Sequence, residues 1–210
     1  MPAPSNREDP PARPSQAERR QAHLTEVETL RAMAHPLRMQ IIGSLRVDGP
    51  ATSAMLARRL GTDSGQASHH LRLLARHGFV VEAPELGKGR HGRERWWKSA
   101  TDSTHWTDNL DNLGPDGAAA IRALEQTAAR VWDNLVDVYR EQVARGEWNP
   151  AWREAAGGGD RVVRLTPARL AAMQDEIQEV IERHDLKDQP ADDAETVVVL
   201  MQAYPRRAPQ

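Results

Sequence analysis

A short stretch of small and hydrogen-bonding side chains carries the clearest chemistry in this sequence. Within Ser64–Arg76 these side chains gather at the front of an expected helix, with a cation behind them. Hydroxyl, amide and imidazole groups in that position can bond to the edges of DNA bases in the major groove. The candidate base-contacting residues are Ser64, Gly65, Gln66, Ser68, His69 and Arg72.

Two short helices joined by a tight turn would present this face. Apolar residues recur in each at the spacing of one buried stripe, and Gly61 ends the first helix without backbone strain. Asp63 is placed to cap the second, because its carboxylate can accept from free backbone N–H groups. The stripe residues are Leu56, Ala57 and Leu60, then Ala67, Leu71 and Leu74. The pattern predicts a helix-turn-helix, and a helical hairpin with a polar outer face is the alternative.

A basic, glycine-rich loop follows. It lies between two strand-forming segments, Phe79–Val81 and Glu94–Lys98, which predicts a hairpin. The loop contains G-x-G-x-x-G, Gly87 to Gly92, but a dinucleotide site needs a helix after these glycines and a strand is expected instead. We therefore interpret them as turn residues that let nearby cations approach a DNA backbone. Those cations are Lys88, Arg90 and Arg93.

Together these features resemble the ArsR-type winged helix-turn-helix repressors over about residues 26–98. The resemblance implies a dimer with a recognition helix in the major groove and a basic wing on the backbone or minor groove. It is carried by Ala34-His35-Pro36-Leu37-Arg38, Leu56-Ala57, Ser68-His69-His70-Leu71 and the basic wing.

The remaining histidines do not indicate a metal site. His70 falls on the inner edge of the second helix and is expected to pack and hydrogen-bond within the domain. His105 lies near Asp102, Asp108 and Asp111, but no second histidine is close, so we expect a solvated segment. The chain has no cysteine, which excludes disulfides and thiolate metal sites. The sequence predicts no cofactor and no metal.

Charge is divided unevenly along the chain. The net charge is −2, yet Ser64–Lys98 holds seven Lys and Arg against three Glu. Asp175–Glu195 holds nine acids against two cations. Phosphate affinity depends on the local face and not on the total charge. The distribution is therefore compatible with double-stranded DNA as a partner.

Length and composition predict one or two compact domains of mainly α (α+β) class. The 210 residues are 39% hydrophobic and 28% charged. With no apolar run long enough to span a bilayer and no signal segment, the expected location is cytoplasmic, with no membrane partner. We expect a disordered tail at 1–22, a winged helix-turn-helix domain at 23–100 and a connecting segment with a long helix at 101–146. A capping box at Thr25 should start the domain's first helix.

The long helix should run from Asp116 to about Ala144. Its apolar residues alternate by three and four, which is a heptad seam that needs a partner helix. That partner is either another helix of the same chain or the same helix of a second subunit, and we favour the homodimer. The seam residues are Ile121, Leu124, Ala128, Val131, Leu135 and Val138.

Residues 147–210 are expected to form a small strand-helix-strand unit. Arg161–Leu165 and Thr196–Tyr204 read as strands, and Thr166 caps the helix between them. The unit either stabilises the dimer or senses a small organic ligand in an apolar cavity. The residues expected to line such a cavity are Trp148, Trp152, Leu170, Met173, Ile177 and Tyr204.

No catalytic constellation is found, because the serines lack a paired histidine and carboxylate at a recognisable spacing. The sequence therefore predicts a DNA-binding transcriptional regulator and not an enzyme. The alternative is a regulatory or assembly protein that uses its winged helix and acidic C-terminal unit for protein–protein interaction.

Overall fold

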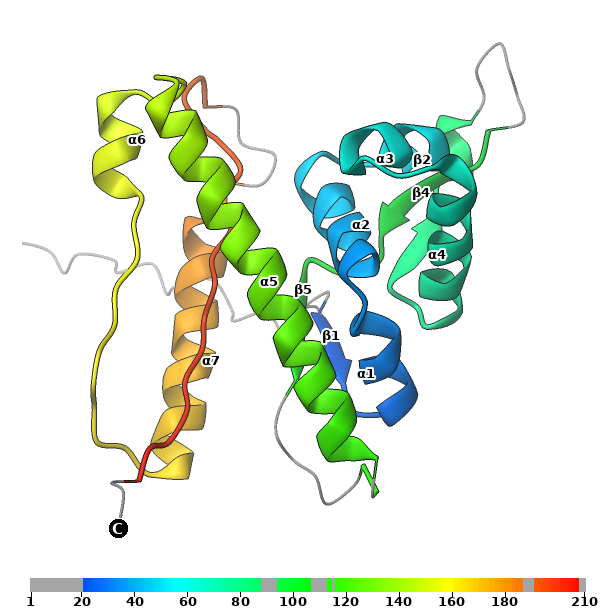
Figure 1. The fold of residues 1–210 in the computed structure, drawn as a ribbon. Coiled ribbons are helices and arrows are strands. Elements are labelled where there is room, and N and C mark those ends of the chain that lie inside the picture. Colours follow the sequence, from blue (N-terminus) through cyan, green and yellow to red (C-terminus); the bar gives the residue numbers. More distant parts are fainter. Residues whose placement is uncertain (1–20, 88–93, 107–112, 115, 187–190, 208–210) are drawn as a thin grey trace, which may run out of the picture. The chain divides into compact units, whose positions relative to one another are not determined.

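The computed structural model describes residues 21–87, 94–106, 113–114, 116–186 and 191–207. The fold is mainly helical, as the sequence predicted, and it contains two small sheets (Figure 1). The chain divides into two compact units, residues 1–136 and 137–210. Within the described ranges, no helix combines the length and the apolar character needed to cross a bilayer.

Four helices of the first unit follow the apolar pattern of the sequence. Pro36 opens the second of them at its first turn, where a missing N–H does no harm. The predicted capping box at Thr25 is wrong, because Glu26 is the N-cap of the first helix and forms no side-chain capping bond. The helices are α1 (Val27–Met33), α2 (Pro36–Val47), α3 (Ser53–Leu60) and α4 (Ser64–Arg76).

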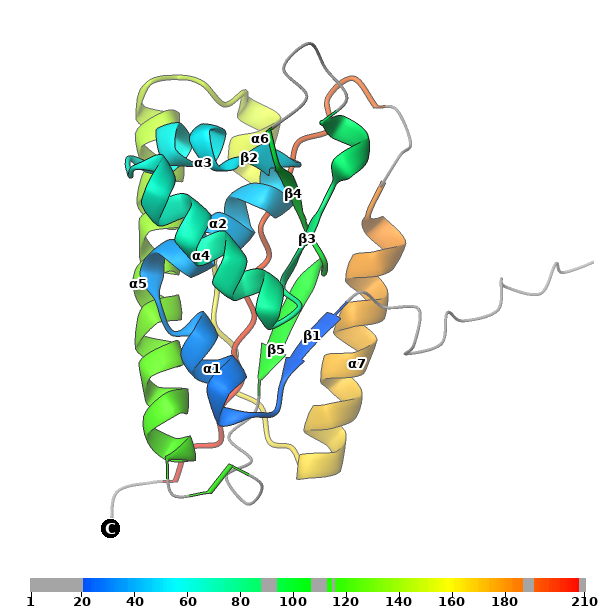
Figure 2. The same ribbon diagram turned by 90° about the vertical axis from the view of Figure 1, so that its right-hand side faces the viewer.

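A three-stranded antiparallel sheet completes the winged-helix core. Its order is β2-β4-β3, with β4 in the centre (Figure 2). Ala51 starts β2, and a short 3₁₀ turn, η2 (Pro84–Leu86), follows β3. The predicted wing tip at 88–93 lies outside the described residues. The strands are β2 (Ala51–Thr52), β3 (Val80–Glu82) and β4 (Trp96–Ser99).

A second sheet was not predicted. β1 (Gln21–Leu24) pairs parallel with β5 (Ser103–Trp106), so the last two residues of the expected tail, 21 and 22, belong to a strand and the expected polar connection contains another. The rest of the expected tail, residues 1–20, lies outside the described residues. Arg46 helps to hold β5, because its guanidinium donates to the carbonyl and hydroxyl of Thr101 and to the hydroxyl of Thr104, each at 2.9 Å. Burial lowers the pKa of Arg46 to about 10. Each strand has only four residues, and a distant partner leaves no local signal.

The long helix is α5 (Gly117–Ala144), close to its predicted bounds. The first half of its apolar seam is not available to a second subunit. Ile121, Leu124 and Ala128 expose 3%, 0% and 0% of their surface, because they pack within their own chain. The prediction that these three residues hold the dimer is therefore wrong. Leu135 and Val138, further along the seam, are exposed.

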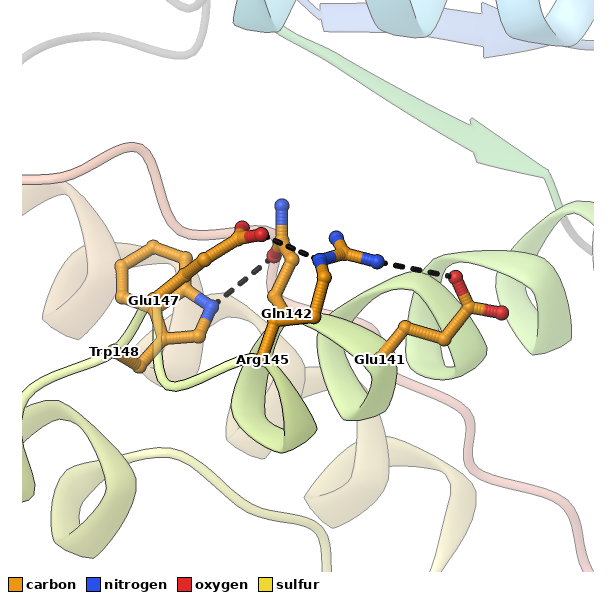
Figure 3. A network of polar contacts seen from close by, with 5 residues as sticks. All are labelled: Glu141, Gln142, Arg145, Glu147 and Trp148. Carbon is orange, nitrogen blue, oxygen red and sulfur yellow. Dashed lines mark hydrogen bonds and ion pairs between the residues drawn. The ribbon is translucent and has the colours of Figure 1, made fainter.

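Helices α6 (Pro150–Ala155) and α7 (Pro167–His184) belong to the second unit, and Thr166 caps α7 as predicted. The chain leaves α5 through Gly146, whose φ of 73° suits glycine. Polar contacts fix this corner: Arg145 bonds to Glu147 and faces Glu141, and the Trp148 indole donates to Gln142 at 3.1 Å (Figure 3).

The two strands predicted around α7 are not formed. Arg161–Leu165 and Thr196–Tyr204 have no strand pairing among the described residues, and their large apolar side chains are exposed. A strand needs a partner along its edge, and the described part of the chain pairs no strand with Arg161–Leu165 or with Thr196–Ala203. The strand-forming composition is real, but the expected strand-helix-strand arrangement is corrected to a single helix with two extended flanks.

Candidate nucleic-acid interface

The turn between α3 and α4 has the geometry that its sequence predicts. Gly61 adopts a φ of 63°, in the left-handed region that favours glycine, and ends α3. The Asp63 carboxylate accepts the Gln66 N–H at 2.8 Å, and this bond is the main cause of the lowered pKa of Asp63. The capped, tightly turned start of α4 holds its first residues in a fixed position.

Burial sorts the residues of α4 into two faces. The predicted stripe is fully buried: Ala67, Leu71 and Leu74 each expose 0% of their surface. The opposite face contains five exposed candidates and one half-buried one, Ser68. The exposed candidates are Ser64, Gly65, Gln66, His69 and Arg72. The face predicted to read bases is therefore available to a partner, and its role in recognition stays a prediction.

The absence of a side chain at Gly65 also has a structural role. A Cβ at this position would lie 3.0 Å from the Asp63 carboxylate oxygen, so a larger residue would disturb the cap of α4. Gln66 is oriented from the turn, where its amide oxygen lies 3.4 Å from the Thr62 hydroxyl. These contacts hold the Gln66 side chain at the exposed first turn of α4, and this position suits contact with one base pair.

A shallow hollow of about 440 Å³ lies between α4 and the β3–β4 sheet. Three arginines and one histidine line it against a single carboxylate, so the hollow is positively charged. Such a surface suits a phosphate group of a DNA backbone. The lining residues are His69, Arg72, Ala75, Arg76, Glu82, Arg95 and Trp97.

The cations near the hollow are not equally available. Arg95 pairs with Glu82 at 3.3 Å and also lies over the Trp97 ring, with its Cζ 5.8 Å from the ring centroid. Arg72 and Arg76 are exposed and form no ion pair with a described residue. Among the described cations of this face, these two arginines are the strongest candidates for phosphate contacts. Lys88, Arg90 and Arg93 lie outside the described residues.

The side chains of His35, Arg38 and His70 form a cluster between α4 and the start of α2. The rings of His35 and His70 lie 4.5 Å apart, which agrees with the predicted packing role of His70. The predicted hydrogen bonding is not seen at Nδ1: this atom in both histidines and Nε of Arg38 are buried without a partner among the described residues. Burial, and then repulsion from neighbouring nitrogen bases, first His35 and then Arg38, lowers the pKa of His70; burial and then Arg38 lower that of His35.

These pKa shifts predict a loss of stability in mild acid. A histidine whose pKa is lowered on folding is neutral in the fold, so the unfolded chain binds more protons as the pH drops below 6.5. Stability is complete above pH 6.5 and declines as the pH falls toward the lower folded pKa. Thermal unfolding at pH 7.5 and 5.5 should show this decline, and His70→Gln should reduce it.

His184→Gln is the matched control, because His184 is exposed at the end of α7. It should leave the difference between the two pH values unchanged. An equal pH dependence in His70→Gln and the unsubstituted protein would rule out His70 as its source.

The sequence did not single out the hollow, although part of it could have been found. Arg76 follows Arg72 by four residues and therefore shares its helix face. Arg95, Glu82 and Trp97 left no comparable signal, because only the pairing of β3 with β4 brings them beside α4.

Comparison with known families identifies the helix-turn-helix. Residues 33–83 match the family model of a helix-turn-helix domain. The match contains α2, α3, α4 and β3, and it ends before the wing loop. The prediction of a helix-turn-helix in this part of the chain is confirmed. No curated protein matches the chain significantly.

Solved structures of transcriptional regulators are similar over larger parts of the chain. A possible transcriptional regulator for arsenical resistance is 24% identical, covering 52% of this chain and 95% of its own, with a TM-score of 0.29. PcaV from Streptomyces coelicolor, in complex with its natural ligand, is 16% identical over 70% and 74%, with a TM-score of 0.28. A mutant MarR from E. coli, complexed with operator DNA, is 17% identical over 73% and 86%, also at 0.28.

Proposed function

We propose that this protein is a DNA-binding transcriptional regulator of the ArsR type that acts as a homodimer and represses by occupying its operator. The observation that carries the proposal is the exposed, capped front of α4 beside a positively charged hollow. Base-edge contacts from the first and phosphate contacts from the second are the two components of sequence-specific DNA binding.

In this proposal Ser64, Gln66 and His69 contact base edges from the major groove. Arg72 and Arg76 then hold the backbone that passes over the hollow, and the wing cations add contacts on the backbone or minor groove. The Ala67 stripe keeps α4 fixed on the domain core, so the side chains approach the DNA as a rigid set.

The proposed dimer uses the second half of the α5 seam. Leu135 and Val138 expose 39% and 42% of their surface and lie three residues apart on the helix. An apolar pair at this spacing is typical of a helix-to-helix contact. Two copies related by a two-fold axis would place two α4 helices on two half-sites.

The ligand role of the second unit stays a prediction. Tyr139, Trp148 and Trp152 form a chain of ring contacts, with centroids 6.2 Å and 6.0 Å apart. Of the six predicted lining residues, Tyr204 is 60% exposed and the other five are half-buried. A ligand would have to cover them to gain from their apolar surface.

Binding to fragments of the DNA upstream of the protein's own coding region tests the proposed function. Gln66→Ala should lower affinity for the selected site by roughly 5- to 150-fold, the equivalent of one lost bidentate base contact of about 1–3 kcal/mol. The loss should vanish when the contacted base pair is changed. Fluorescence anisotropy over a set of single-base-pair variants of the site measures both effects.

Gln174→Ala is the matched control, since Gln174 is an exposed glutamine on α7, away from α4 in sequence. Its affinity should equal that of the unsubstituted protein. If no upstream fragment is preferred over random DNA, the proposed sequence-specific function is wrong.

A further inference from the structure

The C-terminal segment Asp192–Arg207 contains an apolar run, Val197–Met201, that pairs with no other strand among the described residues. Val197–Met201 is five consecutive large apolar residues, three of them valine, which is typical of a strand. These residues expose 36% to 60% of their surface. The backbone of Thr196–Ala203 forms no hydrogen bond to a described residue. Pairing with a second strand would cover these apolar side chains and satisfy these backbone N–H and C=O groups.

The charges around this run have a definite order. Asp192, Asp193 and Glu195 precede it, and Arg206 and Arg207 follow it, all exposed. Two antiparallel copies of the segment would bring the acids of each beside the arginines of the other, at both ends. Two parallel copies in register would place like charges side by side, which is destabilising. The segment is thus complementary to itself in the antiparallel direction only.

We propose that Asp192–Arg207 pairs antiparallel with the same segment of a second copy of this chain. Alignment of Asp193 with Arg206 or Arg207 places the two-fold axis at or beside Leu200. Pro205, which cannot donate a backbone hydrogen bond, then lies near the end of the strand, where its missing N–H costs least. The paired strands form a contact of two-fold symmetry, in which the same patch serves both subunits.

A second candidate partner strand is Arg161–Leu165, whose Val162 and Val163 expose 94% and 55% of their surface. Its charges do not match: Arg161 and Arg164 are both cationic, so neither direction of pairing satisfies both ends of Asp192–Arg207. This contrast favours self-pairing of the C-terminal segment. This pairing adds a second contact to the dimer of the proposed function, on which it rests, but it does not depend on DNA binding.

Cysteine cross-linking of the full chain tests the arrangement, and the absence of natural cysteines makes it free of background. A disulfide needs Cα atoms within about 7 Å of each other. At Leu200, beside the axis, the two copies meet this condition. At Val197 the two copies lie six residues apart along the antiparallel pair, about 20 Å. Leu200→Cys should therefore form a disulfide dimer under copper–phenanthroline oxidation, and Val197→Cys should yield at least about tenfold less.

Val199→Cys and Met201→Cys complete the set, because a shift of the axis by one residue moves the highest yield to one of them. Equal yields at 197 and 200 would indicate parallel strands and overturn the proposal. A dimer formed only between Val163→Cys and Leu200→Cys chains would overturn it in favour of the other partner strand. No dimer at 199, 200 or 201, in protein with unchanged circular dichroism, would overturn it as well.

Charge reversal provides an independent measurement in the Leu200→Cys background. One variant carries Asp192→Lys, Asp193→Lys and Glu195→Lys, and the other carries Arg206→Glu and Arg207→Glu. Each alone places like charges at both ends of the antiparallel pair, so its disulfide yield should fall by roughly tenfold. An equimolar mixture should restore the yield as a mixed dimer. Unchanged yields in both single variants would contradict the proposal.

These measurements are made without DNA. Loss of operator binding would therefore leave the strand pairing standing, and absence of the cross-link would leave the helix-turn-helix function standing.

Discussion

Leu124→Glu is expected to unfold the first unit, or to lower its free energy of unfolding by at least about 4 kcal/mol. Leu124 exposes 0% of its surface and belongs to the apolar core of its own chain. Removing a buried leucine side chain costs about 2–5 kcal/mol, and burying a carboxylate without a partner adds to this. The total stability of such a domain is about 5–15 kcal/mol, so little or none would remain. Urea unfolding followed by circular dichroism measures the change.

Leu135→Glu is the matched control on the same helix and the same seam. Because Leu135 is 39% exposed, the substitution should change the stability of the single chain by no more than about 1 kcal/mol. Its effect should fall on dimerisation instead, as a rise in the dissociation constant seen by sedimentation. If Leu124→Glu unfolds at the same urea concentration as the unsubstituted protein, the intramolecular packing of α5 described above is wrong.

Operator affinity is expected to fall by about 10⁴-fold when salt is raised from 50 to 200 mM. If each subunit contacts about four phosphates, counterion release gives a slope of log affinity on log salt near −7. Arg72 and Arg76 are exposed and form no ion pair with a described residue, which suits two of these contacts. Titrations at four or more salt concentrations measure the slope.

Arg76→Gln should make that slope less steep by about 2, because each subunit of the dimer loses one phosphate contact. Gln66→Ala should weaken specific binding and leave the slope unchanged, since a base contact releases no counterion. These paired variants separate phosphate contacts from base readout. A slope near zero would contradict a DNA interface built on cations.

The described cations beside the wing are paired with nearby carboxylates. The wing's predicted cations Arg90 and Arg93 lie outside the described residues, whereas Arg95 and Lys98 are paired with Glu82 and Glu85. Ser64–Lys98 has more cations than acids in sequence, but two of those cations are neutralised by ion pairs. The described part of this face therefore has fewer free positive charges than its number of Lys and Arg residues indicates. Pairing between adjacent strands decides which of the cations remain available.

Local patterns determined the helix-turn-helix. The stripe of Ala67, Leu71 and Leu74, the turn glycine Gly61 and the cap Asp63 all lie within a few residues of what they control, so the sequence contains both partners of each interaction. The bounds of α5 and the start of α7 at Thr166 were predictable for the same reason: helical hydrogen bonds join residues four apart.

Only the tertiary structure decided which apolar surfaces find a partner inside the chain. The heptad seam of α5 looks uniform in sequence, yet Leu124 is buried in its own unit while Leu135 is exposed. Likewise β1 and β5 pair across the whole winged helix, whereas Val197–Met201, with a stronger strand composition, has no partner among the described residues. Apolar periodicity shows that a face must be covered, but what covers it depends on residues far away in the chain or on a second copy.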